Sequence, residues 1–277
     1  PRRHIKIIFT GSMKNIKILK LFVVMLLFFV SAGHLYALRQ RPYNVIRHKT
    51  IKEYRAMSVS PIGWKVLGYS NDMNPVYYRE FGSGSKTLLV IGGLHGDEPA
   101  ATMSVIKFGE YLYEFPELLK NRVVLIPCIN PDGLIMGTRT NANRIDINRN
   151  FPAPTWKAKY AKNHNNPGRL PGSEPETVLV VNAIYDYKPW MVIGVHQPFG
   201  KIYPSEGVPA DLYKKMSKIS GYGIDFDIGY DTPGSLGGYI SEKSRAIPSI
   251  TFEIGPIDIE PDYDAITYAF LEAANYR

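Results

Sequence analysis

His95 and Glu98 stand with two residues between them in the segment Gly-Gly-Leu-His-Gly-Asp-Glu-Pro, and both residue types bind zinc in proteins. This spacing arises often by chance, so the positions of further ligands decide its value. His196 and Glu253 lie far along the chain, each at the end of an apolar run. Three ligands of the types His, Glu and His leave one zinc position for water, as catalytic zinc sites do. We therefore predict that His95, Glu98 and His196 bind one Zn²⁺ ion per chain.

A catalytic carboxylate is also expected at such a site. It would take a proton from the attacking water and pass it to the leaving amine. Glu253, in the run Thr-Phe-Glu-Ile-Gly, is the candidate for this general base and acid. Its apolar neighbours should raise its pKa, which suits a group that must hold a proton between the two steps.

The elements that carry these residues predict that they converge. Residues 87–91, 190–195 and 247–254 are apolar runs that read as buried strands, and the four candidates lie at or just past their carboxyl ends. In a parallel sheet those ends share one edge, where open α/β folds place their ligand sites. After the first of these strands, two glycines turn the chain and Pro99 opens a helix expected over residues 99–114.

The rest of the chain alternates between predicted strands and helices without internal repeats. Further strands are expected over residues 64–70, 76–81 and 122–128, and further helices over residues 173–187, 212–219 and around Phe270, with Gly-rich loop over 221–238. This pattern predicts an α/β fold with a doubly wound, mostly parallel or mixed central sheet and helices on both faces. No low-complexity linker divides residues 38–277, so we expect one catalytic domain there.

A polar stretch from Gly137 to Gly172 is rich in Asn, Arg, Pro and Gly, and loops of this length within a domain are usually functional or disordered. It contains Arg139, Arg144 and Arg149. A solvated basic loop is one interpretation. Guanidinium groups near a zinc that cleaves amides have two natural tasks, which are binding a substrate carboxylate and stabilising the oxyanion.

Six separated motifs over residues 50–277 resemble, in order and spacing, the carboxypeptidase A-like zinc metallopeptidases. They are the segment of His95 and Glu98, Asn130-Pro-Asp-Gly, Asp146-Ile-Asn-Arg-Asn-Phe-Pro, Ser173-Glu-Pro-Glu-Thr, His196 and Thr251-Phe-Glu. The resemblance implies that His95, Glu98 and His196 are the zinc ligands and that Glu253 is the general base. It further implies that Arg139 assists the oxyanion and that Asn148 and Arg149 hold the substrate's terminal carboxylate.

Within that family, Gly237-Gly-Tyr and the segment Pro248–Gly255 resemble the bacterial murein-peptide amidases, which cleave the bond between γ-D-glutamate and meso-diaminopimelate. Relatives place a tyrosine over the substrate, and Tyr222, Tyr230 and Tyr239 all remain candidates for that role. The glycines would leave room for a long side chain, and Asp231 is a conceivable partner for the second amine of diaminopimelate.

The basic character of the chain belongs to its N-terminal segment. The 277 residues carry a net charge of +8, but without residues 1–37 there are 27 basic against 25 acidic groups, which gives nucleic-acid binding little support. Residues 13–37 have a basic start, an apolar run and small residues near Ala37, so we predict a signal peptide, with an uncleaved membrane anchor as the alternative. Residues 1–12 precede the first suitable methionine and are expected to lie outside the natural protein. The lone Cys128 closes an apolar strand and is expected in the core.

The sequence therefore predicts an exported bacterial zinc metallopeptidase, periplasmic or secreted, that hydrolyses an amide bond next to a free carboxylate. Murein peptides of the cell wall are the expected substrate, and membrane contact is expected only through an uncleaved signal segment. Two alternatives stay open. One is an N-acyl amino acid deacylase of the desuccinylase or aspartoacylase type, which shares the His-Gly-x-Glu and Asn-Arg motifs. The other is an inactive binding module that kept the fold.

Overall fold

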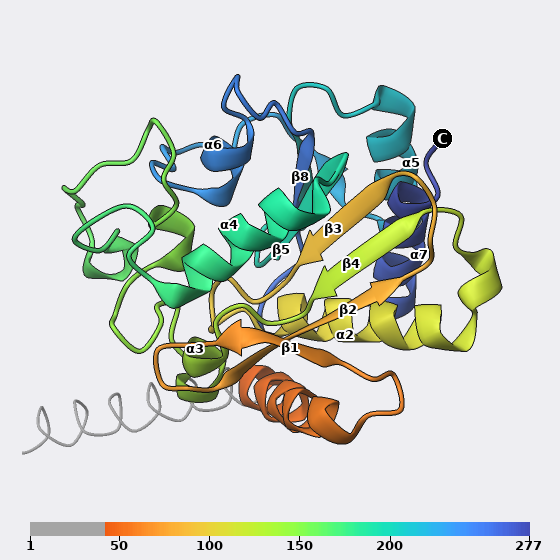
Figure 1. The fold of residues 1–277 in the computed structure, drawn as a ribbon, viewed down its shortest axis with the longest axis horizontal. Helices are drawn as coiled ribbons and strands as arrows, with labels where there is room; N and C mark the ends of the chain where they lie inside the picture. The colour runs from red at the N-terminus through yellow and green to blue at the C-terminus, as the bar shows by residue number, and fades with distance from the viewer. Residues whose placement is uncertain (1–41) are drawn as a thin grey trace, which may run out of the picture.

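The computed structural model describes residues 42–277, so the predicted signal segment and the residues before it lie outside the described part. The described residues form one eight-stranded sheet in the order β1-β2-β4-β3-β5-β8-β6-β7 (Figure 1). The strands are β1 (Lys65–Tyr69), β2 (Pro75–Phe81), β3 (Thr87–Ile91), β4 (Arg122–Ile126), β5 (Met191–His196), β6 (Lys201–Pro204), β7 (Gly223–Ile224) and β8 (Ser249–Glu253). The four central strands β4, β3, β5 and β8 are parallel. β2 pairs antiparallel with β1 and β4, whereas β6 pairs antiparallel with β8 and parallel with β7. The predicted mixed α/β sheet is confirmed.

Helices cover both faces of this sheet, as predicted. They comprise residues 42–56 and α2 (Pro99–Glu114), α3 (Pro131–Met136), α4 (Pro175–Tyr187), α5 (Ala210–Ser220), α6 (Leu236–Ile240) and α7 (Tyr263–Ala274). One buried cluster joins α2, α5 and α7 to the sheet, and a second joins α4 and α6 to the opposite face. Figure 1 shows α4 crossing the sheet from the viewer's side. Alternate residues of the central strands enter the two clusters, since neighbouring side chains of a strand point to opposite faces.

The strands and helices next to the candidate site follow from strong local signals. All five residues of β3 are buried, as expected for a central strand with helices on both sides. Helix α2 begins at Pro99 and ends at Glu114, which are the predicted bounds. The last helix, α7, buries Ile266, Phe270 and Ala273 against the sheet.

Strand β6 and helix α6 beside the candidate site were not predicted, nor was helix α3. Strand β6 contains only four residues, with Lys201 and Pro204 at its ends, so no apolar run marks it. Helix α6 lies at the end of the predicted Gly-rich loop, and Ser235 caps its first turn by accepting a hydrogen bond from the backbone N–H of Gly238. The capping serine outweighs the low helix propensity of two glycines in this short helix.

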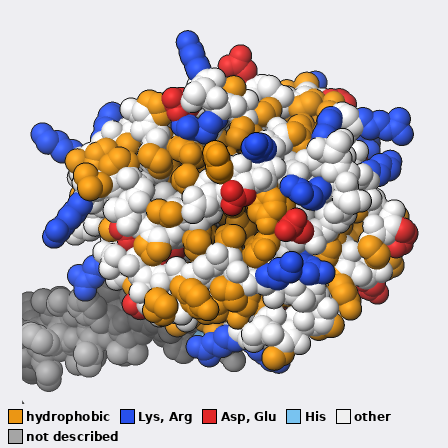
Figure 2. All heavy atoms as spheres, in the orientation of Figure 1, with side chains coloured by type: hydrophobic (Ala, Val, Ile, Leu, Met, Phe, Trp, Pro, Cys, Tyr) orange, Lys and Arg blue, Asp and Glu red, His pale blue; other side chains and the backbone are white. Residues whose placement is uncertain are grey.

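The polar segment between residues 137 and 172 forms the green loops on the left of Figure 1 and contains two short 3₁₀ turns. Its base is closed by the buried Asn150, whose side-chain amide donates hydrogen bonds to the carbonyl oxygens of Pro167 and Leu170. Figure 2 shows Lys and Arg side chains projecting from the margins of the molecule, with acidic and apolar side chains between them. In residues 42–277, no helix has the length and apolar content needed to cross a membrane.

Candidate active site

His95 and Glu98 owe their positions to a tight turn between β3 and α2. Gly96, between them, lies so close to α3 that a Cβ atom there would come within 1.9 Å of the carbonyl carbon of Gly133. Only glycine permits this approach of two backbones. Glu98 is the residue before the first turn of α2, and Gln197 accepts a hydrogen bond from the Ala100 backbone N–H at 3.0 Å. The start of α2 is therefore tied to the residue that follows His196.

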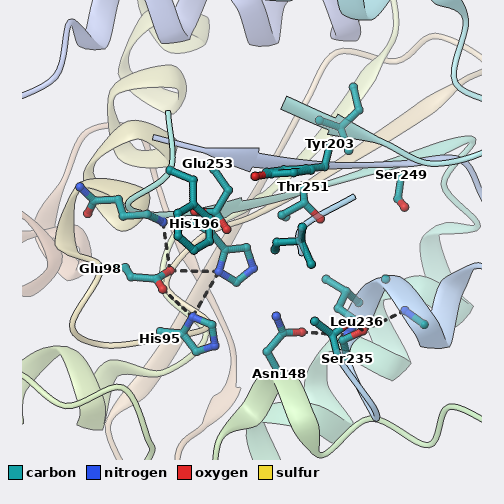
Figure 3. A pocket seen from close by; sticks show the side chains of 18 of the residues that line it. His95, Glu98, Asn148, His196, Tyr203, Ser235, Leu236, Ser249, Thr251 and Glu253 are labelled. Carbon is teal, nitrogen blue, oxygen red and sulfur yellow. Dashed lines mark hydrogen bonds and ion pairs between the residues drawn. The ribbon is translucent and has the colours of Figure 1, made fainter. Parts of the chain in front are cut away.

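The structure brings His95, Glu98 and His196 together, with one ligand atom from each lying within 4.8 Å of the others (Figure 3). The Nδ1 atom of His95 lies 2.7 Å from Glu98 Oε1, and the Nδ1 atom of His196 lies 3.0 Å from Glu98 Oε2. The two Nδ1 atoms are 3.2 Å apart. Two imidazole nitrogens and a carboxylate aimed at one point form a donor set that fits a zinc ion.

Charge interactions among these buried groups are strong. Burial and the Arg139 cation oppose a proton on His95, but the carboxylates of Glu98 and Asp146 outweigh them and raise its pKa to about 9. Burial lowers the pKa of His196. Burial alone would raise the pKa of Glu98, but the two histidines hold it well below its usual range. The cluster therefore keeps a carboxylate ionised in the interior, which is the form that binds a cation.

Asp146 contacts the cluster through His95, and the sequence analysis assigned it no role. It is fully buried, its Oδ1 atom lies 3.2 Å from His95 Nε2, and its Oδ2 atom accepts a hydrogen bond of 2.9 Å from Arg139 Nε. A proton on His95 Nε2 leaves the lone pair of Nδ1 directed at the other two ligands. The position of Asp146 in the segment Asp-Ile-Asn-Arg, beside the candidates Asn148 and Arg149, could have indicated a role at the site.

Glu253 lies beside the cluster on the neighbouring strand. In the register of β5 and β8 it pairs with His196, so both side chains stand on the same face of the sheet. Its Oε2 atom is buried and has no hydrogen-bond partner among the described residues. Burial, together with the negative charge of Glu98, raises the pKa of Glu253 to about 8. The direction agrees with the prediction from its apolar neighbours.

The long-loop residue expected to assist the oxyanion, Arg139, and the two expected to bind the substrate carboxylate also line the pocket. The guanidinium group of Arg139 lies beside Glu98, with Nη1 at 3.7 Å from Oε1. Asn148 accepts a hydrogen bond of 2.9 Å from the backbone N–H of Leu236, which leaves its amide nitrogen available. Arg149 is buried, donates to the Asn148 carbonyl oxygen and forms a side-chain hydrogen bond with Tyr230.

Of the remaining candidates from the sequence, only Tyr230 lines the pocket. Asp231 is exposed and does not line the pocket, although Tyr230 and Thr232 on either side of it do. Of the three tyrosines considered from the sequence, Tyr230 lines the pocket, whereas Tyr222 packs against Phe252 in the core cluster. Tyr239 packs against Phe151 on the far side of α6 from the pocket lining.

The pocket is a cleft of about 610 Å³ between the sheet and α6. Its catalytic end contains the cluster, Glu253 and the two arginines. Beyond them the floor is formed by β5, β6 and β8, where Figure 3 shows Thr251 and Ser249 along the same strand as Glu253 and Tyr203 beside them. Such a volume accommodates a small peptide or amino acid derivative.

A family model described as zinc carboxypeptidase matches residues 43–199, which is more than half of the chain. The chain belongs to the zinc carboxypeptidase family. The matched range includes both histidines and Glu98. The protein is accordingly a metallopeptidase, and thus a hydrolase, of a family that uses zinc.

Curated relatives in this family include murein peptide amidase A of Escherichia coli (strain K12), which is 31% identical over 192 residues and is matched over 65% of this chain and 76% of the relative. Murein peptide amidase A of Vibrio campbellii is 32% identical over 195 residues, or 66% of this chain and 75% of the relative. The crystal structure of murein-tripeptide amidase from Escherichia coli O157 superposes with a TM-score of 0.65 at 29% identity, covering 80% of this chain and 96% of that one. Bovine thrombin-activatable fibrinolysis inhibitor, at 19% identity and a TM-score of 0.63 over 85% of this chain and 95% of that one, shares the fold.

Proposed function

We propose that this zinc carboxypeptidase is an exported murein peptide amidase that hydrolyses the amide bond between γ-D-glutamate and meso-diaminopimelate. The observation that carries the proposal is the convergence of His95, Glu98 and His196 at one end of an open cleft, beside the buried Glu253, whose Oε2 atom has no hydrogen-bond partner among the described residues. The murein peptide amidases among its relatives supply the substrate class.

In the proposed mechanism, His95, Glu98 and His196 would hold one zinc ion. When bound, zinc would supply a Lewis acid for the substrate carbonyl and would lower the pKa of the attacking water. Glu253 would accept a proton from the attacking water on its Oε2 atom, which has no hydrogen-bond partner among the described residues, and would return it to the leaving amine. Burial raises the pKa of Glu253 above that of an ordinary carboxyl group, which favours its holding the proton until the amine leaves.

The long loop positions the substrate. Arg139 faces the cluster and stabilises the negative charge that develops on the carbonyl oxygen. Arg149 and the amide nitrogen of Asn148 bind the free carboxylate next to the scissile bond. Tyr230, hydrogen-bonded to Arg149 and half exposed at the pocket, covers the bound peptide.

Digestion of the peptide L-Ala-γ-D-Glu-meso-diaminopimelate by zinc-loaded protein tests the proposal. Mass spectrometry should find free diaminopimelate and L-Ala-D-Glu as products. Preferred hydrolysis of N-succinyl or N-acetyl amino acids would instead identify a deacylase. Binding of the peptide without hydrolysis of any of these compounds would identify an inactive binding module.

Export rests on residues 13–37, which lie outside the described residues. We propose that this segment is a signal peptide that directs the enzyme to the cell wall. N-terminal sequencing of the protein recovered from the periplasm or medium should give a chain that starts close after Ala32 or Ala37. Recovery of the uncleaved chain in the membrane fraction would identify an anchor.

A further inference from the structure

The two ends of the cleft differ in the kinds of side chain that line them. The charged lining residues all lie at or near the catalytic end, and they are His95, Asp97, Glu98, Arg139, Arg149, His196 and Glu253. Beyond Glu253, every other residue that lines the cleft is uncharged. A substrate side chain that enters this far end therefore meets no charged residue in its lining, and the charges of Lys201 and Asp225, which act on Tyr203, pair with each other.

Strand β8 places two hydroxyl groups in line with Glu253. Ser249, Thr251 and Glu253 alternate along the strand, so they share a face and lie about 7 Å apart in succession. Tyr203 pairs with Thr251 across β6 and β8 and also lines the cleft. Figure 3 shows Tyr203, Thr251 and Ser249 grouped on the side of Glu253 that faces away from the histidines.

These hydroxyl groups are available to a ligand. The hydroxyls of Tyr203, Thr251 and Ser249 form no hydrogen bond with the described residues, although Ser249 is buried and its backbone N–H is bonded to Ser205. Space above them is kept by α6, where a Cβ atom on Gly237 would meet no atom closer than 4.0 Å. The far end is thus a neutral chamber with unused hydroxyl groups.

We propose that Tyr203, Thr251 and Ser249 form a specificity site for a side chain whose end carries both an amine and a carboxylate. Each hydroxyl can donate one hydrogen bond and accept others, so the same group of residues can pair with an ammonium and a carboxylate. The tip of such a substrate side chain has no net charge and needs no buried counter-ion. A side chain with only one charge, such as that of lysine, would lose water without gaining an opposite charge.

This inference rests on the proposed function and identifies the feature of diaminopimelate that the cleft recognises. It replaces Asp231, the conceivable partner from the sequence, with residues that lie in the cleft. It also assigns distinct tasks to one strand, in which Glu253 transfers a proton and the two residues before it on the same face select the substrate.

The test compares four peptides of the form L-Ala-γ-D-Glu-X. X is meso-diaminopimelate, lysine, 2-aminopimelate, which lacks the distal amine, or norleucine, which lacks both distal groups. The wild-type enzyme should cleave the diaminopimelate peptide with a kcat/KM at least about tenfold above those of lysine and 2-aminopimelate. The variant Ser249→Ala/Thr251→Val should lose most of this preference while its kcat/KM for norleucine changes about twofold or less.

Thr177→Val is the matched control, since Thr177 is a fully buried threonine on α4 whose hydroxyl has no partner and which does not line the cleft. It should leave the order of the four substrates unchanged. Ser249→Asp should raise the kcat/KM for lysine relative to diaminopimelate by about tenfold or more, because it supplies a carboxylate to the ammonium.

Equal cleavage of the lysine and diaminopimelate peptides by the wild-type enzyme would overturn the inference but not the proposed function. An equal loss for all four peptides in the double variant would also overturn it. Failure to cleave any of the peptides would count against the proposed function alone. In that case the affinities of the zinc-loaded protein for free meso-diaminopimelate and free lysine, measured by calorimetry, test the specificity site. Equal affinities would overturn the inference.

Discussion

The catalytic end and the far end of the cleft differ in how their polar side chains are paired. At the catalytic end, buried charges compensate one another within hydrogen-bonding distance, as between His95, Glu98 and Asp146. At the far end, neutral hydroxyls such as that of Ser249 are left without partners. Charged groups fix a reaction that is the same for every substrate, whereas unpaired neutral groups discriminate between side chains. Substitutions at the two ends should therefore change different kinetic parameters.

Glu253→Gln should have the largest effect. The variant keeps the shape of the side chain but cannot accept the proton, so kcat should fall by about 10²- to 10⁴-fold for all substrates alike. Zinc content, measured by atomic absorption, should stay at one ion per chain. A variant with a near-normal kcat would show that another group is the base.

Asp146→Asn should weaken zinc binding by about 10- to 100-fold, because it removes the carboxylate that orients His95. Competition with a chelator of known affinity measures this change. Glu176→Gln is the matched control, since Glu176 is also fully buried but bonds to Asn71 and Asn141 rather than to a ligand of the cluster. Equal zinc affinities in the two variants would contradict an orienting role for Asp146.

Gly237→Leu should affect only the far end. The new side chain would occupy open space in the chamber, so kcat/KM for the diaminopimelate peptide should fall by about tenfold or more. Cleavage of the corresponding alanine peptide should be largely kept, and Gly237→Ala should have a smaller effect on both. A parallel loss with both peptides would mean that α6 acts on the catalytic end.

Tyr230→Phe should have the smallest effect. Loss of its hydrogen bond to Arg149 should raise KM about two- to tenfold with little change in kcat. Tyr222→Phe should change neither parameter, because Tyr222 packs against Phe252 in the core cluster. A similar effect in both variants would leave the covering tyrosine unassigned.

The sequence predicted the catalytic end far better than the far end, for a physical reason. β3, β5 and β8 are apolar runs, and residue types with strong chemistry follow them, so the shared edge of a parallel sheet predicts that they meet. The far end consists of serine, threonine and tyrosine, which are ordinary residues of a strand. Ser249, Thr251 and Glu253 do share a period of two, and this alternation was the available signal.

Other features depended on contacts that no local pattern specifies. β6 is short and is held by its pairing with β8, so it has no signature of its own. Asp146 received no role because its importance comes from bonds to His95 and Arg139, which lie in different loops. The exposure of Asp231, between two residues that face the cleft, likewise depends on the path of a loop rather than on residue type.

The closed base of the long loop has a consequence for variation in this enzyme. Because Asn150 bonds to the chain on its return at Pro167 and Leu170, the intervening residues form an excursion whose two ends are already joined. Within that excursion Phe151 and Ala153 pack in the core, and the carbonyl oxygen of Asn166 accepts a hydrogen bond from the backbone N–H of Asp146. The exposed residues 157–164 can change in length and composition without moving Asn148 or Arg149, since loop closure costs little more for a longer loop once its ends are fixed. This stretch is the natural place to graft a tag or a binding peptide onto this scaffold.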